Sequence, residues 1–161
     1  TIFSDAGMRH DEIESCLTTG CFDYCDLFDR ARTLAAFRAR AGFSDMLLGF
    51  KRMNNIYASF IAKNAGYALK LNAEALTGEA EKQLHAFFSS RNERIAEAIE
   101  SGAYETLFTI LTEARPVIDA FFDSVMVMDK DVAVRDNRLA LLQWILGLFA
   151  GLMDFSKISD Q

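Results

Sequence analysis

Residues 116–128 read Pro-Val-Ile-Asp-Ala-Phe-Phe-Asp-Ser-Val-Met-Val-Met, and they open the most apolar part of the chain. Their apolar side chains recur at helical spacing, so we predict a helix that starts near the single proline and buries one broad face. That face comprises Val117, Ile118, Phe121, Phe122, Val125 and Met126. After the polar residues 129–131, a second helix is predicted with the same period, through Leu139, Leu142, Ile145 or Leu146, Phe149 and Met153. We expect the other helices to pack against this pair.

The run 139–153 raises a choice between a membrane helix and a core helix. Gln143 is its single polar residue, and Gly147 and Gly151 have the spacing of close helix contacts in membranes. The run is shorter than the roughly 18 apolar residues that a membrane span needs. Arg138 and Asp154 also flank it. We therefore predict a core helix, in which the two glycines let a neighbouring helix approach closely.

The composition favours an all-α fold. Hydrophobic residues make up 51% of the 161 residues, and there is one proline in the chain. Ala, Leu, Glu and Arg are abundant, which favours helices over strands. We predict a single domain, an antiparallel bundle of about six helices, with residues 1–20 as an N-terminal helix and lead-in and residues 21–158 as the core. Because the chain opens at Thr1 without an initiator Met, we expect it to be a piece of a larger protein.

Caps and breaks place the remaining helices. Ser4 or Asp5 is predicted to cap a first helix that ends at Gly20. The later helices are expected at about 23–41, from 44 or 45 onward, at 77–102, and from 104 to just before Pro116, with a connection or irregular helix at 61–77. In the helix that starts at 44 or 45, Met46, Phe50, Met53 and Tyr57 share one face, and Lys51, Arg52 and Asn55 project from the opposite side.

The charge is unevenly distributed. The net charge of −6 argues against indiscriminate binding of nucleic acid. Residues 29–52 nevertheless carry a local balance of +4, from Arg30, Arg32, Arg38, Arg40, Lys51 and Arg52 against Asp29 and Asp45. Such a basic segment fits a protein that binds a polyanion at one surface, and it equally fits a solvated helix face.

No catalytic or metal-binding pattern is visible. Cys16, Cys21 and Cys25 have neither zinc-site nor iron–sulfur spacing, and with no secretory signal we expect reduced thiols in a cytoplasmic protein. Asp119 and Asp123 lie four residues apart but lack the Glu-x-x-His pairs of di-metal bundles. Phosphate loops and nucleophile elbows are also missing. We therefore predict that this chain is itself non-catalytic and binds no cofactor.

Two stretches resemble a known family. Phe50-Lys-Arg-Met-Asn-Asn-Ile56 resembles the Phe-Lys-Arg-x-x-Asn-Ile motif of the bacterial glycyl-tRNA synthetase beta subunit. Residues 116–128, followed by Arg135-Asp-Asn-Arg-Leu-Ala-Leu-Leu142, are similar to the C-terminal anticodon-binding domain of that subunit, and Arg30-Ala-Arg-Thr-Leu-Ala-Ala-Phe37 also fits. The resemblance covers about residues 5–158.

The resemblance implies an all-helical, DALR-type anticodon-binding domain, related to that of arginyl-tRNA synthetase. The parent enzyme would pair alpha and beta subunits and attach glycine to its tRNA using ATP. ATP and glycine would bind to the alpha subunit, which agrees with a non-catalytic chain. The implied partners are glycine tRNA, the alpha subunit and the rest of the beta subunit, without membrane or DNA.

The helix after residue 44 is then the expected tRNA-binding element. An anticodon loop offers splayed bases to aromatic, amide and Arg side chains, and phosphates to cations. We hypothesise that Lys51 and Arg52 contact phosphates or base edges, that Asn54 or Asn55 reads a base, and that Arg38 and Arg40 add positioning charge. The alternative is that the Asn pair satisfies backbone groups between helices and the arginines are solvated. Relatives tend to carry basic residues just after Arg-Leu-Ala-Leu-Leu, where this chain has Trp144 and Leu146, so we expect Trp144 in the core.

Two other functions remain open from the sequence. One is the corresponding domain of arginyl-tRNA synthetase. The other is a helical protein-interaction or dimerisation module without nucleic acid, which the acidic average charge and the methionines would favour.

Overall fold

The structure is a computed structural model that describes residues 6–18, 20 and 23–158. The described residues form eight α-helices, two short 3-10 helices and no strand, which confirms the predicted all-α class. The elements are α2 (His10–Leu17), α3 (Tyr24–Arg38), α4 (Phe43–Lys63), η1 (Ala73–Ala75), α5 (Glu79–Ser89), α6 (Asn92–Ser101), α7 (Tyr104–Glu113), α8 (Arg115–Ser124), α9 (Val132–Leu148) and η2 (Phe155–Lys157).

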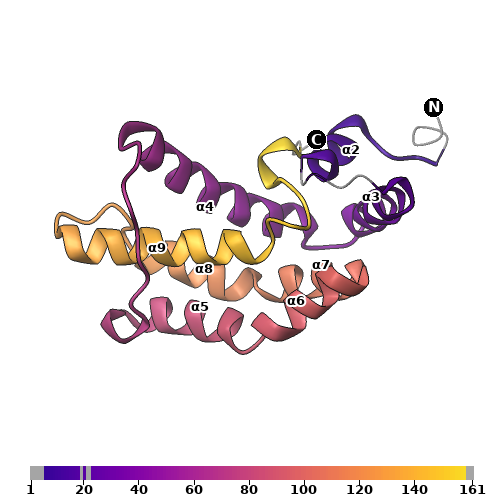
Figure 1. Cartoon of the computed structure of the whole chain (residues 1–161). Helices are drawn as coiled ribbons and strands as arrows, with labels where there is room; N and C mark the ends of the chain where they lie inside the picture. Colours follow the sequence, from indigo (N-terminus) through magenta and orange to yellow (C-terminus); the bar gives the residue numbers. More distant parts are fainter. Residues whose placement is uncertain (1–5, 19, 21–22, 159–161) are drawn as a thin grey trace.

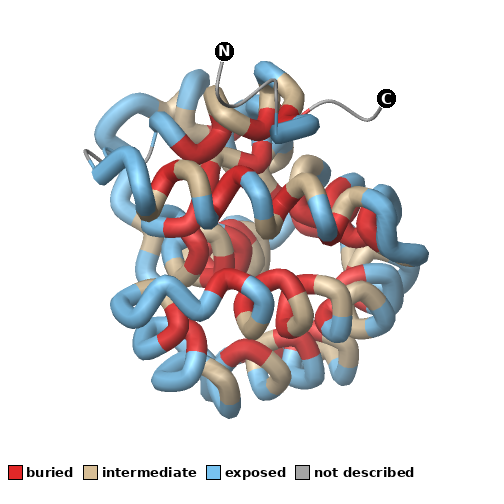
Figure 2. Tube along the Cα trace, turned by 90° about the vertical axis from the view of Figure 1, so that its right-hand side faces the viewer, coloured by how far each residue is buried: buried red, intermediate tan, exposed pale blue. Residues whose placement is uncertain are grey.

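The helices pack in layers around α8 and α9 (Figure 1). α4 lies against α9 and α8 on one side, and α5 lies against both on the other. At one end of the molecule, α7 contacts α3 and α6, and α2 packs on α3 and η2. Figure 2 shows the buried residues on the inner sides of the helices and the exposed ones outside. α4, α5, α6 and α7 thus pack on α8 or α9, as predicted, whereas α2 and α3 pack mainly on each other, on α7 and on η2.

Aromatic side chains fix α4 to its neighbours. The ring of Phe50 stacks on Phe155 of η2 with centroids 4.7 Å apart, and it meets Phe149 edge-on at 5.7 Å. Phe88 of α5 contacts Phe50 and Phe149 in the same way. Such pairs contribute about 0.5–1.5 kcal/mol each beyond the area they bury. They hold η2 and the end of α9 under the middle of α4.

The run 139–153 lies in the core, as predicted. Its face residues are fully or almost fully buried, namely Leu139, Leu142, Ile145, Phe149 and Met153. In the part of the chain that is described, no helix has the length and apolarity of a membrane span. The prediction for its glycines was wrong for Gly147, because a Cβ there would meet nothing within 4 Å. At Gly151 a Cβ would lie 3.4 Å from Ile99 Cγ2 of α6. A closer approach is at Gly49 of α4, where a Cβ would lie 2.8 Å from Ile118 Cγ2 of α8.

The predicted helix at 77–102 is two helices. α5 ends at Ser89 and α6 begins at Asn92. The hydroxyl of Ser90 and the guanidinium of Arg91 both donate to the carbonyl of Phe87, at 3.0 and 3.1 Å. These side chains provide hydrogen-bond donors for a carbonyl at the C-terminal end of α5, so the helix can end there. The chain then turns, and α6 packs on α7 while α5 packs on α8.

The predicted ends of three helices also differ. α8 stops at Ser124, so Val125 and Met126 are not on its buried face, and Met126 is 73% exposed. Asp131 explains the start of α9, because its carboxylate accepts from the backbone N–H groups of Ala133 and Val134. α9 ends at Leu148 and the chain turns before Met153. The predicted caps Ser4 and Asp5 lie outside the described residues, and α2 begins at His10.

The family-like stretch 135–142 clamps the connection after α4 onto α9. Asn137 and Asn72 join by two hydrogen bonds, from Asn72 N to Asn137 Oδ1 at 2.8 Å and from Asn137 Nδ2 to Asn72 O at 3.0 Å. Arg138 donates to the buried carboxylate of Glu81 at 2.6 Å and to Asp129 at 2.8 Å. These bonds make the motif a structural signature of the fold.

A second polar pair completes this clamp. Asp136 accepts from the Tyr67 hydroxyl at 2.5 Å and from Nε and Nη2 of Arg135 at 2.9 and 2.7 Å. Burial raises the pKa of Asp136, but these hydrogen bonds outweigh it and hold that pKa below its ordinary value. The ionised carboxylate is therefore the form that the fold favours.

Candidate functional site

α4 carries four of the six predicted site residues. Gly42, with φ +85°, turns the chain from α3 into α4, a conformation that side chains disfavour. Met46, Phe50 and Met53 are fully buried, which confirms the predicted inner face. Helical residues are turned by about 100° from one to the next, so Arg52 and Asn54 lie on opposite flanks, about 160° apart.

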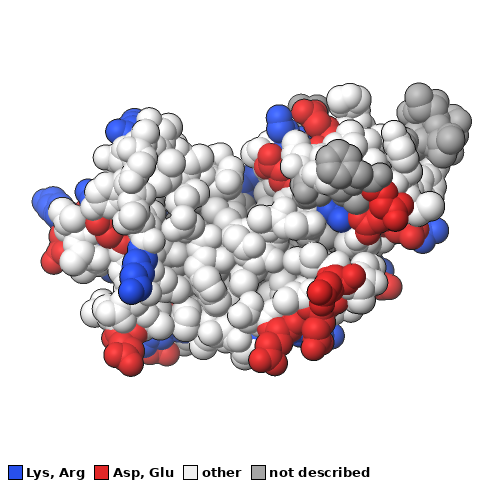
Figure 3. Space-filling view, viewed as in Figure 1, with Lys and Arg blue, Asp and Glu red and all other residues white. Residues whose placement is uncertain are grey.

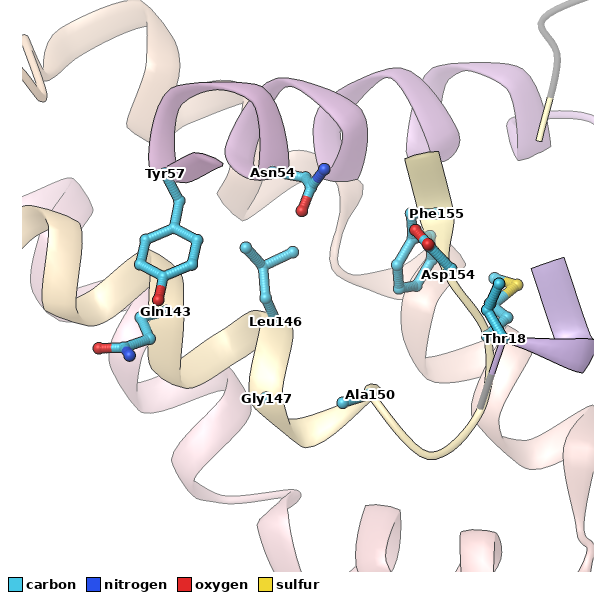
Figure 4. Close-up of a pocket in the computed structure, with 10 residues that line it drawn as sticks. Thr18, Asn54, Tyr57, Gln143, Leu146, Gly147, Ala150, Asp154 and Phe155 are labelled. Atoms are coloured by element: carbon cyan, nitrogen blue, oxygen red, sulfur yellow. The ribbon is translucent and has the colours of Figure 1, made fainter. Parts of the chain in front are cut away.

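The Asn54 flank forms a groove with a single charged side chain, which we call the amide groove. It encloses about 420 Å³ between α4, α9 and η2, and it is lined by Asn54, Tyr57, Gln143, Leu146, Asp154 and Phe155 among others. Figure 4 shows Asn54 and Tyr57 projecting from α4 toward Gln143 and Leu146 of α9. The one charged group, Asp154, accepts from the backbone and hydroxyl of Ser156 at 2.9 and 2.7 Å. Two amides and an aromatic ring therefore line this groove.

The amide groove corrects the prediction for Tyr57. The period of α4 assigned Tyr57 to the buried face, but its ring is half-buried and lines the groove. Gln143 was not predicted as a site residue. Its signal was present in the sequence, because it is the single polar residue in the apolar run 139–153 and it is exposed. A single amide side chain in an otherwise apolar helix indicates that one side of the helix reaches the protein surface.

The far end of α4 forms a second groove, which we call the basic groove. It encloses about 510 Å³ between α4 and the α8–α9 loop. Its lining residues are Asn55, Ile56, Ser59, Phe60, Lys63, Asn64, Met128 and Arg135. Two of them are cationic and none is acidic, in a chain of net charge −6. Asn55 therefore faces a different groove from Asn54.

Arg52 lies in a third, acidic groove between α4 and α8. Its guanidinium carbon is 4.2 Å from the centroid of the Phe122 ring. The groove is lined by Asp45, Asp119 and Asp123 against Arg52 and Arg115. The carboxylates of this groove disfavour a second anion, so Arg52 is poorly placed for a phosphate. Lys51 is half-buried on the outer face, between the flanks.

The arginines of α3 mostly serve the fold. Arg30 is buried and donates to the carbonyls of Gly151 and Leu152 at 2.9 and 2.8 Å and to Asp26 at 2.6 Å. Burial, followed by a hydrogen bond to Asp26, raises the pKa of Tyr104 to about 12 in the same cluster. The basic segment 29–52 therefore does not form one continuous cationic surface.

Arg38 and Arg40 also have protein partners. Arg38 Nη2 lies 2.8 Å from the fully buried Glu12 Oε1, and burial raises the pKa of Glu12. Arg38 thus ties α3 to α2. Arg40 lies over the ring of Phe37 and pairs with Glu105 at 3.0 Å, with both side chains exposed. Neither arginine lines the amide groove or the basic groove.

The face that carries α4 and α9 is nearly uncharged at its centre. Figure 3 shows this pale surface, hollowed between α4 and the part of the molecule that carries α2, with acidic side chains gathered over α6. Those on α6 are Glu93, Glu97 and Glu100. A polyanion would approach this face more easily than the α6 end.

The described residues contain no cluster of three or more His, Cys, Asp or Glu side chains that could hold a metal ion. Burial raises the pKa of the Cys16 thiol to about 11, while Cys25 is exposed and Cys21 lies outside the described residues. The grooves along α4 offer amides, an aromatic ring and cations. Such groups bind planar polar ligands and phosphates.

Comparisons with known proteins agree with such a ligand. Residues 46–159 match the family model described as the DALR anticodon binding domain. The chain is similar to the glycine–tRNA ligase beta subunits of Moorella thermoacetica (35% identical, 98% of this chain and 22% of the relative), Desulforudis audaxviator (35%, 97% and 22%) and Nitratidesulfovibrio vulgaris (38%, 91% and 21%). The chain thus spans about a fifth of the length of the curated relatives it matches.

Proposed function

The chain belongs to the family of DALR anticodon binding domains, and we propose that it recognises the anticodon region of glycine tRNA as part of a glycine–tRNA ligase beta subunit. The matched region contains α4 from Met46 onward and α9, the two helices that form the amide groove. That groove is the observation that supports the proposal most directly.

The amide groove has the chemistry that a splayed base needs. Unstacked bases are bound by stacking on aromatic side chains and by hydrogen bonds to their polar edges. Tyr57 supplies a ring, and Asn54 and Gln143 each supply an amide with two N–H donors and one acceptor oxygen. We propose that Asn54 and Gln143 read one base and that Lys51, on the adjacent outer face of α4, contacts the phosphate beside it.

The other residues predicted to bind tRNA lie outside the amide groove. Asn55 faces the basic groove, Arg40 is exposed, and Arg52 is stacked on Phe122 in the acidic groove. Arg38 is engaged with Glu12, so we assign it to the packing of α2 and not to tRNA.

We place the chemistry of the enzyme outside this chain. In this proposal, ATP and glycine bind to the alpha subunit, and the present chain selects the tRNA in the cytoplasm. Its partners would be the tRNA, the alpha subunit and the remainder of the beta subunit.

Substitutions in the amide groove test the proposal. Asn54→Ala and Gln143→Ala should each weaken binding of glycine tRNA, by roughly 5- to 150-fold if a base contact worth about 1–3 kcal/mol is lost. Lys82→Ala, an exposed cation on α5, is the control and should bind like the unaltered chain. Circular dichroism melts show whether each variant folds. Unchanged affinity in both folded groove variants would contradict this assignment, and binding of a protein partner without any tRNA would favour the interaction module.

A further inference from the structure

The basic groove lies on the opposite flank of α4 from the amide groove, and its lining differs in charge. The amide groove has one carboxylate and no cation, and the acidic groove has three carboxylates and two cations. The basic groove has Lys63 and Arg135 and no carboxylate. Of the three, it is the groove that an anionic ligand would enter at least electrostatic cost.

We propose that the basic groove binds a second unstacked nucleotide of a single-stranded RNA loop, with Lys63 and Arg135 on its phosphate and Ile56 and Met128 against its base. This proposal rests on the proposed function, because it takes the ligand to be RNA. It adds a second nucleotide, bound on the other side of the same helix.

The guanidinium of Arg135 is fixed in position by its neighbours. Its Nε and Nη2 donate to Asp136 Oδ1 at 2.9 and 2.7 Å, and Asp136 is itself fixed by Tyr67. The guanidinium carbon also lies 5.1 Å from the centroid of the Phe60 ring. A guanidinium carries five N–H donors. The bonds to Asp136 use Nε and Nη2, and the Tyr67 hydroxyl also interacts with this guanidinium, so Arg135 is held in place while Nη1 stays outside the pair with Asp136.

The floor and rim of the groove suit a base. Ile56 and Phe60 form an apolar floor on α4, and Met128, 50% exposed, lies opposite on the α8–α9 loop. Asn55 and Ser59 are exposed polar groups at the rim. The volume of about 510 Å³ is within the range of pockets that hold small ligands.

The path between the two grooves is also suited to RNA. Ala58 and Ala62 are exposed on the outer face of α4. Their small side chains allow a nucleic-acid backbone to cross the helix closely. Two nucleotides of one loop would then be splayed to the two flanks of α4, with Asn54 facing one and Asn55 facing the other.

The test uses the 161-residue chain and a glycine tRNA anticodon stem-loop carrying one abasic nucleotide at a time. Ser59→Tyr fills the basic groove and should weaken binding of the intact stem-loop roughly 5- to 150-fold, the range for losing the contacts of one base. That loss should vanish for one abasic position only, and this position should differ from the one at which Asn54→Ala loses its effect. Ala36→Tyr, the same kind of substitution at an exposed site on α3, should change nothing.

Lys63→Ala supplies an independent readout. Removing one phosphate contact should make the plot of log affinity against log salt concentration shallower by about 0.7. Lys82→Ala should leave this slope unchanged. If Ser59→Tyr and Lys63→Ala both behave like their controls while Asn54→Ala still weakens binding, the second nucleotide site is refuted and the proposed function stands. If the stem-loop does not bind to the unaltered chain, the proposed function itself fails.

Discussion

Because α4 crosses α8 closely at Gly49, we predict that a larger side chain at this position lowers the stability of the fold. A Cβ at this position would lie 2.8 Å from Ile118 Cγ2, whereas carbon atoms pack at about 3.5–4.0 Å. Ile118 is buried and β-branched, so its methyl group has little room to move. Gly49→Ala should gain about 1 kcal/mol of helix propensity and lose about 1–3 kcal/mol to overpacking. Gly147→Ala in α9, where a Cβ meets nothing within 4 Å, should show the helix gain alone.

The difference between these two variants isolates the steric cost. We expect Gly49→Ala to be less stable than Gly147→Ala by about 1–3 kcal/mol in urea unfolding followed by circular dichroism, because helix propensity cancels between them. Ile118→Leu removes the Cγ2 methyl, so it should be less damaging in the Gly49→Ala background than in the unaltered chain. Equal stability of Gly49→Ala and Gly147→Ala would refute the close approach of α4 and α8.

Three further substitutions probe the polar interior and the thiols. Arg138→Met should cost about 3 kcal/mol in urea unfolding, since the nearly buried Glu81 loses its charged partner, and a cost below about 1 kcal/mol would count against the clamp. Asp136→Asn should reduce the loss of stability on acidification: the folded-state pKa of Asp136 is lowered, so its contribution is present above the ordinary value of 3.8 and is lost as the pH falls through the folded value. A chain that loses as much stability between pH 7 and pH 3 with this substitution as without it would contradict that shift. In a background with Cys21 replaced by serine, Cys25 should react rapidly with a thiol reagent at pH 8, and Cys16 should react only on unfolding. Fast labelling of both thiols would contradict the burial of Cys16.

The periodic parts of the fold were predictable from the sequence. Phe121, Leu139 and Ile145 are buried as their spacing predicts, because the helical period decides which face meets a core. Helix ends were less predictable. The break between α5 and α6 depends on Ser90 and Arg91 reaching one carbonyl, an interaction that no pattern of apolar residues contains.

The candidate site was predictable only in part. The sequence identified α4 and its outer face, because charged and amide residues interrupt an apolar stripe there. It did not separate Asn54 from Asn55, which face different grooves, because the groove walls come from α9 and the α8–α9 loop. Arg30 and Arg38 were counted as surface charge because their partners, Leu152 after α9 and Glu12 on α2, are distant in sequence and could not be foreseen.

We propose above all that this chain selects a tRNA through its anticodon region. The most direct measurement is a titration of the 161-residue chain with glycine tRNA and with arginine tRNA over a series of salt concentrations. We expect tighter binding of glycine tRNA, weakened by salt because phosphate contacts release counterions. Tighter binding of arginine tRNA would assign the chain to a different synthetase, and no binding of either tRNA at low salt would contradict the claim.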